Sequence, residues 1–142
     1  MTEFDYPGVM PMIAYEDGPA AIEWLGRVFG FRERARLLDN KDGRLTHGEM
    51  ETDHGVVMLA TPTHDYEGPR RHRESCAAAA RWSRVPYIVD GVLVYVDDVK
   101  THYERAVAGG ATILSPLEDD TSGKRYRAED LEGHRWMFMQ VP

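Results

Sequence analysis

The 142-residue chain repeats one order of predicted elements in its two halves. Three pairs of identical residues recur at an offset of 80: Tyr15 and Tyr95, Asp17 and Asp97, and Gly30 and Gly110. Each half is predicted to form a strand, a helix, another strand and then a hairpin. Because only two copies are present, the pattern excludes a solenoid and predicts a duplicated module that buries one face against its copy.

Apolar periodicity and turn residues place the elements of each half. The first half is predicted to contain a strand at 9–15, a helix at 20–29, and strands at 31–38, 45–51 and 55–61. The second half is predicted to contain a strand at 91–96, a helix at 99–108, and strands at 111–114, 124–127 and 134–141. Pro19 suits a helix start, where its missing N–H costs nothing. Ser115-Pro116 is predicted to end the strand before it.

The segment at residues 62–86 differs from both halves in composition. It holds five arginines and only three acidic residues: Arg70, Arg71, Arg73, Arg81 and Arg84 against Asp65, Glu67 and Glu74. We predict that this segment is a basic linker with a short helix over 74–82. The linker is long enough to have a function beyond connecting the two halves. Two roles stay open, a lid over an acidic or aromatic ligand and a solvated linker or dimer contact. The predicted organisation is one domain over 1–142, with modules at 8–61 and 87–142.

Composition excludes several classes of function. The formal net charge of −7 argues against a general nucleic-acid binder, which needs a basic face. The single cysteine, Cys76, excludes an intrachain disulfide and a multi-cysteine zinc site, and we expect a small buried thiol. No apolar stretch approaches the roughly 18 residues of a membrane span, and the first residues lack a signal-peptide pattern. We therefore expect a cytoplasmic protein with no nucleic-acid or membrane partner.

Two polar side chains in the first half are candidates for catalysis. His47 and Glu49 lie two residues apart on a predicted strand, so they share a face, while the opposite row of Thr46, Gly48 and Met50 suits packing under a helix. The pair can act as a general acid and base or as polar anchors for a ligand. As metal ligands they number only two, which is few for a site. The alternative is a solvated strand face with a surface ion pair.

Candidates for ligand binding lie in the linker and the second half. Arg135 shares a strand face with Met137 and can clamp a carboxylate or phosphate. Trp82 and Tyr95 supply aromatic surface, although Tyr95 can equally bury its ring and expose its hydroxyl. His134 lies on the opposite strand face and is expected to cap the core.

Several sequence blocks together resemble a known family. They are AIEWLGRVFGF at 21–31, LTHGEM at 45–50 with GVVML at 55–59, LVYVDDV at 93–99 with AVAGGAT at 106–112, and RYRAEDLEGHRW at 125–136. The chain resembles the vicinal-oxygen-chelate superfamily, which holds glyoxalase I, extradiol dioxygenases and bleomycin-resistance proteins. Within it, the pattern is most similar to the metal-poor glyoxalase-like proteins of the phosphonate-operon type. The blocks cover most of the chain except residues 62–86.

The resemblance implies an α+β fold of two βαβββ modules whose curved sheets form a cleft, and often a homodimer. It also implies metal ligands on the first and fourth strands of each module, near Met10, Met58, Gly91 and Met137. None of these residues offers the nitrogen or oxygen ligand that a divalent cation prefers. A thioether suits copper(I) better, and methionines lining an apolar pocket are the simpler interpretation. We therefore expect no metal and no other cofactor.

Two classes of function follow. The first is a protein that binds a small apolar or aromatic molecule in a metal-free cleft, for sequestration or resistance, with Met10, Met58, Trp82, Tyr95, Arg135 and Met137 as ligand-binding residues. The alternative is a glyoxalase- or epimerase-type enzyme that acts on a small carbonyl compound. His47 and Glu49 would then be the acid–base or ligand groups.

Overall fold

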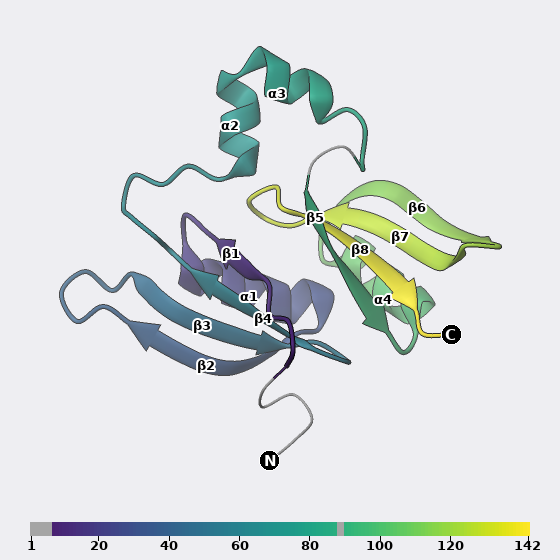
Figure 1. The fold of residues 1–142 in the computed structure, drawn as a ribbon, viewed down its shortest axis with the longest axis horizontal. Coiled ribbons are helices and arrows are strands. Elements are labelled where there is room, and N and C mark those ends of the chain that lie inside the picture. Colours follow the sequence, from purple (N-terminus) through teal and green to yellow (C-terminus); the bar gives the residue numbers. More distant parts are fainter. Residues whose placement is uncertain (1–6, 88–89) are drawn as a thin grey trace. The chain divides into compact units, whose positions relative to one another are not determined.

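The computed structural model describes residues 7–87 and 90–142, and the chain divides into two compact units, 1–66 and 67–142. Each unit contains one four-stranded mixed sheet (Figure 1). The described residues also form four helices. The predicted α+β class with one βαβββ module in each half is confirmed. A cleft between the two sheets concerns the relation between the units and stays a prediction.

The first unit contains five elements: β1 (Met12–Ala14), α1 (Gly18–Phe29), β2 (Arg32–Leu38), β3 (Leu45–Glu51) and β4 (Val56–Ala60). Its strand order is β1-β4-β3-β2, with β1 parallel to β4 and the other pairs antiparallel. Asp17 caps α1, since its Oδ1 accepts a hydrogen bond of 3.0 Å from the Ala20 N–H. The helix ends at Gly30, whose φ of 73° is in the left-handed region that glycine favours.

The second unit contains seven elements: α2 (Pro69–Ser75), α3 (Ala77–Trp82), β5 (Gly91–Val96), α4 (Val99–Ala108), β6 (Thr112–Asp120), β7 (Gly123–Glu129) and β8 (Arg135–Gln140). Its strand order, β5-β8-β7-β6, repeats that of the first unit, again with one parallel pair, β5 with β8. None of the helices within residues 7–87 and 90–142 is both long and apolar enough to cross a lipid bilayer.

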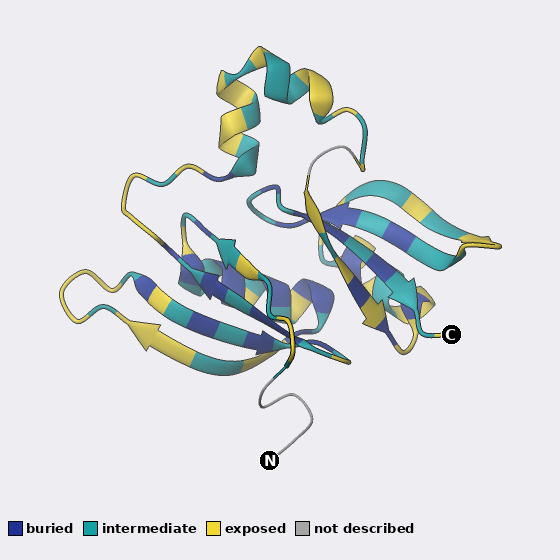
Figure 2. Cartoon of the chain, in the orientation of Figure 1, coloured by how far each residue is buried: buried dark blue, intermediate teal, exposed yellow. Residues whose placement is uncertain are grey.

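In the first unit, α1 covers the sheet face that carries Gly48 and Met50. A Cβ placed on Gly48 would lie 3.3 Å from the Cδ1 of Ile22, and one on Gly26 would lie 3.9 Å from the Cε of Met50. Gly48 and Met50 are both buried, and Figure 2 shows buried residues alternating with less buried ones along β3. The predicted helix-facing row is confirmed for Gly48 and Met50, with His47 and Glu49 on the opposite face, whereas Thr46 of the same predicted row is exposed.

In the second unit, α4 covers the face that carries Tyr126 and Phe138. The His102 ring lies 4.1 Å from that of Phe138, and the Tyr103 ring 5.0 Å from that of Tyr126. His102 Nδ1 and the Tyr126 hydroxyl share a hydrogen bond of 2.6 Å. Burial raises the pKa of that hydroxyl above its ordinary value, with the neighbouring Tyr103 adding to the rise. The aromatic core of this unit therefore contains one polar pair, His102 and Tyr126, whose hydrogen bond satisfies the buried hydroxyl.

The internal repeat aligns at an offset of 81, not 80, at the first strand and the start of the helix in each unit. Where the helices end, the predicted offset of 80 holds, since Gly30 and Gly110 both have a positive φ. Tyr15 is fully buried, whereas Tyr95 is 42% exposed, and the buried equivalent is Val96. Likewise, Asp98 caps α4 in the way that Asp17 caps α1, since its side chain accepts a hydrogen bond from the Thr101 N–H. The predicted pairs of Tyr15 with Tyr95 and Asp17 with Asp97 are therefore wrong by one position, because identical residues do not share an environment.

Two predicted boundaries also need correction. The helix expected over 74–82 is two short helices, interrupted at the half-buried Cys76, whose φ of −132° and ψ of 111° are extended. Ser115-Pro116 does not end a strand, because β6 continues through it with irregular register. Since β6 is the edge strand of its sheet, a proline there need not remove a ladder hydrogen bond.

Gly18→Ala is expected to lower the free energy of unfolding by about 1–3 kcal/mol, a typical cost of overpacking. Gly18 is buried, and a Cβ on it would come within 2.5 Å of Leu45 side-chain atoms close to the backbone. Urea denaturation followed by circular dichroism measures the change. Gly8→Ala is the matched control, because a Cβ on Gly8 meets nothing within 4 Å. Equal stability of the two variants would contradict the packing argument.

Candidate functional site

His47 and Glu49 form a polar pair on β3, on the face away from α1. His47 Nε2 lies 2.5 Å from Glu49 Oε2, so the imidazole N–H donates to the carboxylate. The second carboxylate oxygen of Glu49 lies 2.9 Å from the Nε of Arg34. Glu49 is therefore held between a guanidinium and an imidazole, an arrangement that orients the histidine ring. Both predicted residues are brought together, and Arg34 is a partner that the sequence analysis missed.

Met58 lies on the same face as this pair, because β3 and β4 place Glu49 opposite Met58. The parallel partner of Met58 on β1 is Met12, whose side chain is 75% exposed. Met10 lies before β1 begins, so it is not the strand neighbour of Met58. Methionines therefore lie beside the His47–Glu49 pair in the first unit. Met12, and not Met10, is the first-strand residue next to Met58.

The second sheet has a face that α4 does not cover, here called the uncovered face. It consists of Leu93, Tyr95, Arg125, Arg127, Met137 and Met139. Strand pairing places Met137 between Leu93 and Arg127. Leu93 and Tyr95 are both more than two-fifths exposed, although each carries a large apolar surface. Two of the predicted ligand-binding residues, Tyr95 and Met137, therefore share one face.

The two arginines of the uncovered face differ in their partners. Arg125 is paired with Asp120 at 2.8 Å and with Glu118 at 3.3 Å. No described residue pairs with Arg127, which is half-buried beside Met137. Arg127, Leu93 and Met137 line a pocket of about 180 Å³ at this face. An unpaired guanidinium beside thioether and aliphatic surface is a donor available to a bound molecule.

Arg135 is not an open clamp but is bound within its own unit. Its Nε donates to Glu129 Oε2 at 3.1 Å, and its terminal nitrogens donate to the carbonyls of Ser83 and Val85. Only 5% of its side chain is exposed. It borders the pocket of the uncovered face, but most of its donors are already used. Arg135 thus fastens the chain after α3 to the sheet.

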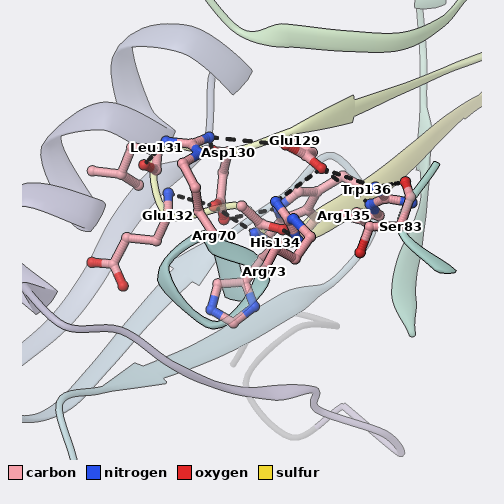
Figure 3. Close-up of polar contacts among 11 residues, drawn as sticks. Arg70, Arg73, Ser83, Glu129, Asp130, Leu131, Glu132, His134, Arg135 and Trp136 are labelled. Atoms are coloured by element: carbon pink, nitrogen blue, oxygen red, sulfur yellow. Dashed lines mark hydrogen bonds and ion pairs between the residues drawn. The ribbon is translucent and has the colours of Figure 1, made fainter. Parts of the chain in front are cut away.

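Three guanidinium groups surround the carboxylate of Glu129 (Figure 3). Arg73 and Arg135 each approach its Oε2 at 3.1 Å, and Arg70 lies 4.0 Å from its Oε1. Arg70 also donates to the carbonyls of Leu131 and Asp130 at 2.6 and 2.8 Å. The first turns of α2 are thereby attached to the end of β7 and the turn after it. Two arginines of the predicted basic linker are therefore structural contacts of the second unit.

The turn between β7 and β8 is organised by Asp130, which is 1% exposed. Its Oδ1 accepts from the backbone N–H groups of Glu132 and His134 at 3.0 Å, and its Oδ2 accepts from Trp136 Nε1 at 3.0 Å. Gly133 has a φ of 90°, and a Cβ there would lie 2.9 Å from the backbone nitrogen of Arg70. The turn sequence thus creates the close approach that α2 needs. The side chain of His134 lies at this turn, just before β8.

The positions where the family resemblance implies metal ligands carry no suitable donors. Met58 lies between Met12 and Glu49, and Met137 lies between Leu93 and Arg127, so Glu49 supplies the one carboxylate among these strand neighbours. Within residues 7–87 and 90–142, no group of three or more His, Cys, Asp or Glu side chains lies close enough to hold an ion. A divalent metal of the usual oxygen- and nitrogen-ligated kind does not fit these residues.

These features define a small α+β protein of two matched units, each with one sheet face away from its helix. The chain belongs to the Glyoxalase/Bleomycin resistance protein/Dioxygenase superfamily, whose sequence model matches residues 9–138. The similarity spans both units and the linker between them.

Comparison with individual proteins gives the same fold. The crystal structure of TioX from Micromonospora sp. ML1 superposes with a TM-score of 0.69 at 34% identity, covering 96% of this chain and 97% of that one. TnmS3, an antibiotic binding protein from Streptomyces sp. CB03234, superposes with a TM-score of 0.64 at 16% identity, covering 99% and 100%. The protein Mb0911c of Mycobacterium bovis is 28% identical over 94% of this chain and 83% of its own length.

Glu129→Gln is expected to lower the free energy of unfolding by about 3 kcal/mol, because it leaves buried guanidinium groups without their anion. Urea denaturation measures the loss, and limited proteolysis within residues 69–82 measures detachment of α2 and α3. Glu74→Gln is the control, because Glu74 is exposed on α2 and pairs with no described residue. If both variants keep the stability of the parent, the Glu129 cluster does not hold the helices.

Proposed function

We propose that this protein binds a small aromatic molecule on the uncovered face of the second sheet, without a metal cofactor. The observation that carries the proposal is the unpaired Arg127 beside Leu93 and Met137 in a pocket of about 180 Å³. Apolar surface with few convergent polar groups is the usual composition of a small-molecule site.

The side chains of the pocket and of the rest of the uncovered face indicate the kind of ligand; Tyr95 and Met139 lie on this face but outside the pocket lining. Met137 and Met139 are flexible and polarizable, so they adapt to aromatic rings of varied shape. Tyr95 adds a ring whose exposure lets it stack on a planar compound. Arg127 can stack on the same plane or donate to a carbonyl oxygen of the ligand. A planar aromatic compound bearing carbonyl groups satisfies all of these contacts.

The relatives support a role in sequestration or resistance. TnmS3 is described as an antibiotic binding protein, and the family description includes bleomycin resistance proteins. Membership of the metal-poor phosphonate-operon group, homodimer formation and a cytoplasmic location belong to the same proposal. Met10, Met58 and Trp82 are proposed ligand contacts outside the uncovered face. Sedimentation equilibrium tests the homodimer directly.

Arg127→Met is expected to weaken binding of 1-aminoanthraquinone about tenfold, through loss of a charge-assisted hydrogen bond to a ring carbonyl. The same substitution leaves 1-aminoanthracene, which lacks the carbonyls, bound within about twofold, because stacking on apolar surface does not need the guanidinium. Fluorescence titration measures both dissociation constants.

Lys124→Met is the matched control for this test. It removes one positive charge from the same strand, but Lys124 lies toward α4, beside Asp98, and not on the uncovered face. The control should leave both probes bound as in the parent. If Arg127→Met changes neither probe, or if neither probe binds the parent protein, Arg127 does not serve a ligand site of this kind.

The second candidate function is an enzyme of the glyoxalase or epimerase type. The specific observation in its favour is the arrangement of Arg34, Glu49 and His47 on β3 and its neighbour β2. The carboxylate accepts from both partners and fixes the imidazole, which is about one-third exposed and can exchange a proton with a carbonyl compound. Such a reaction would depend on this chain's side chains, since the expected metal positions carry no suitable donors.

The purified protein is expected to contain less than stoichiometric zinc, nickel, manganese or iron and not to convert the hemithioacetal of methylglyoxal and glutathione. The reason is that thioethers occupy the expected ligand positions. Elemental analysis and a spectrophotometric assay measure the two quantities. Stoichiometric metal together with turnover that His47→Ala abolishes would establish the enzyme instead. Turnover unchanged by His47→Ala would remove that residue from any active site.

A further inference from the structure

A second and larger pocket lies in the second unit, between the two short helices and the start of β8. Its volume is about 320 Å³, within the range of sites that hold small organic ligands. Residues of α2, of α3 and of the turn at Gly133 contribute to its lining; Figure 3 shows Arg73, Ser83, His134 and Arg135 among them. The described lining residues are Pro69, His72, Arg73, Ala79, Trp82, Ser83, Asp90, Gly133, His134 and Arg135.

The pocket is positively charged on the side of the Glu129 cluster. Arg73 and Arg135 line it, and Asp90 is the one acidic side chain among the described lining residues. Arg73 uses one N–H toward the Gly133 carbonyl and one toward Glu129, so further donors of its guanidinium stay available. Burial lowers the pKa of Arg73, and repulsion from Arg135 and Arg70 adds to the lowering while Glu129 opposes it. A second anion near Arg73 would relieve that repulsion.

Other lining residues of the pocket are aromatic or apolar. Trp82 is 54% exposed although it is the largest side chain of α3, and Pro69 and Ala79 extend the same surface. A half-exposed indole gains free energy when a second ring covers it. The pocket therefore pairs a stacking surface with a cationic donor.

We propose that this pocket binds a small aromatic carboxylate, whose ring stacks on Trp82 and whose carboxylate is held by Arg73. This site is distinct from the ligand site proposed on the uncovered face. Arg135 is the one described residue that lines both pockets, and its guanidinium is bonded to Glu129 and to the carbonyls of Ser83 and Val85.

The test is calorimetric titration of the full chain with 2-naphthoate and with its uncharged counterpart 2-naphthamide. We expect 2-naphthoate to bind about tenfold more tightly than the amide, because only the acid gains a charge-assisted contact with the guanidinium. Ala79→Phe fills the pocket and is expected to weaken naphthoate binding at least tenfold, by steric exclusion. Ala77→Phe is the matched control, since Ala77 is exposed on the same helix and does not line the pocket.

Two further variants keep the test decisive. Trp82→Ala removes the stacking surface without a hydrogen bond being lost, so it replaces Ala79→Phe if that variant fails to fold. Arg127→Met is expected to leave naphthoate binding unchanged, which separates this site from the uncovered face. Equal binding of acid and amide, full binding by both pocket variants, loss of binding in Arg127→Met, or no naphthoate binding to the parent would each overturn the proposal.

Discussion

In each unit a single helix lies across one face of a four-stranded sheet, and the contacts of that helix decide which side chains the other face presents. Contacts of α1 fix the row with Gly48 and Met50, and contacts of α4 fix the row with Tyr126 and Phe138. Because strand side chains alternate, every residue next to these must point away from its helix. A slip of β7 by one position would bury the charge of Arg127 and expose the ring of Tyr126, at a large cost in free energy. The candidate sites are therefore consequences of core packing.

The same alternation explains what could be predicted from the sequence. The shared face of His47 and Glu49, and the place of Met137 on a face away from the core, follow from spacing alone. The partners of Arg135 do not, since alternation fixes the direction in which an arginine leaves a strand but not what its long side chain reaches. Its contacts at Ser83 and Val85 lie about 50 positions away in sequence, and the attachment of α2 spans a similar distance. The sequence analysis did not predict Arg127 as a binding residue. Whether an arginine has an acidic partner depends on tertiary contacts, which spacing along the chain does not give.

The two units preserve one framework and differ in charge at equivalent register positions. Strand pairing places Glu49 opposite Met58 in the first unit and Arg127 opposite Met137 in the second. Glu49 is neutralised by Arg34 and bonded to His47, whereas Arg127 has no partner among the described residues. A methionine therefore occurs at the same register position in both units, but its strand neighbour is an acidic residue in the first unit and a basic residue in the second. Each unit therefore offers a different polar group beside a similar thioether surface.

The attachment of α2 and α3 explains why the pockets of the second unit lie where they do. Neither helix has a buried residue, so apolar packing does not hold them (Figure 2). They are held by hydrogen bonds and ion pairs from Arg70, Arg73 and Arg135 to Glu129 and to backbone carbonyls. Apolar side chains pack until almost no space is left between the surfaces, whereas long guanidinium side chains bridge a gap and keep it open. Both pockets border Arg135, the most deeply buried of these arginines, so the residue that attaches the chain after α3 to the sheet also lines both cavities.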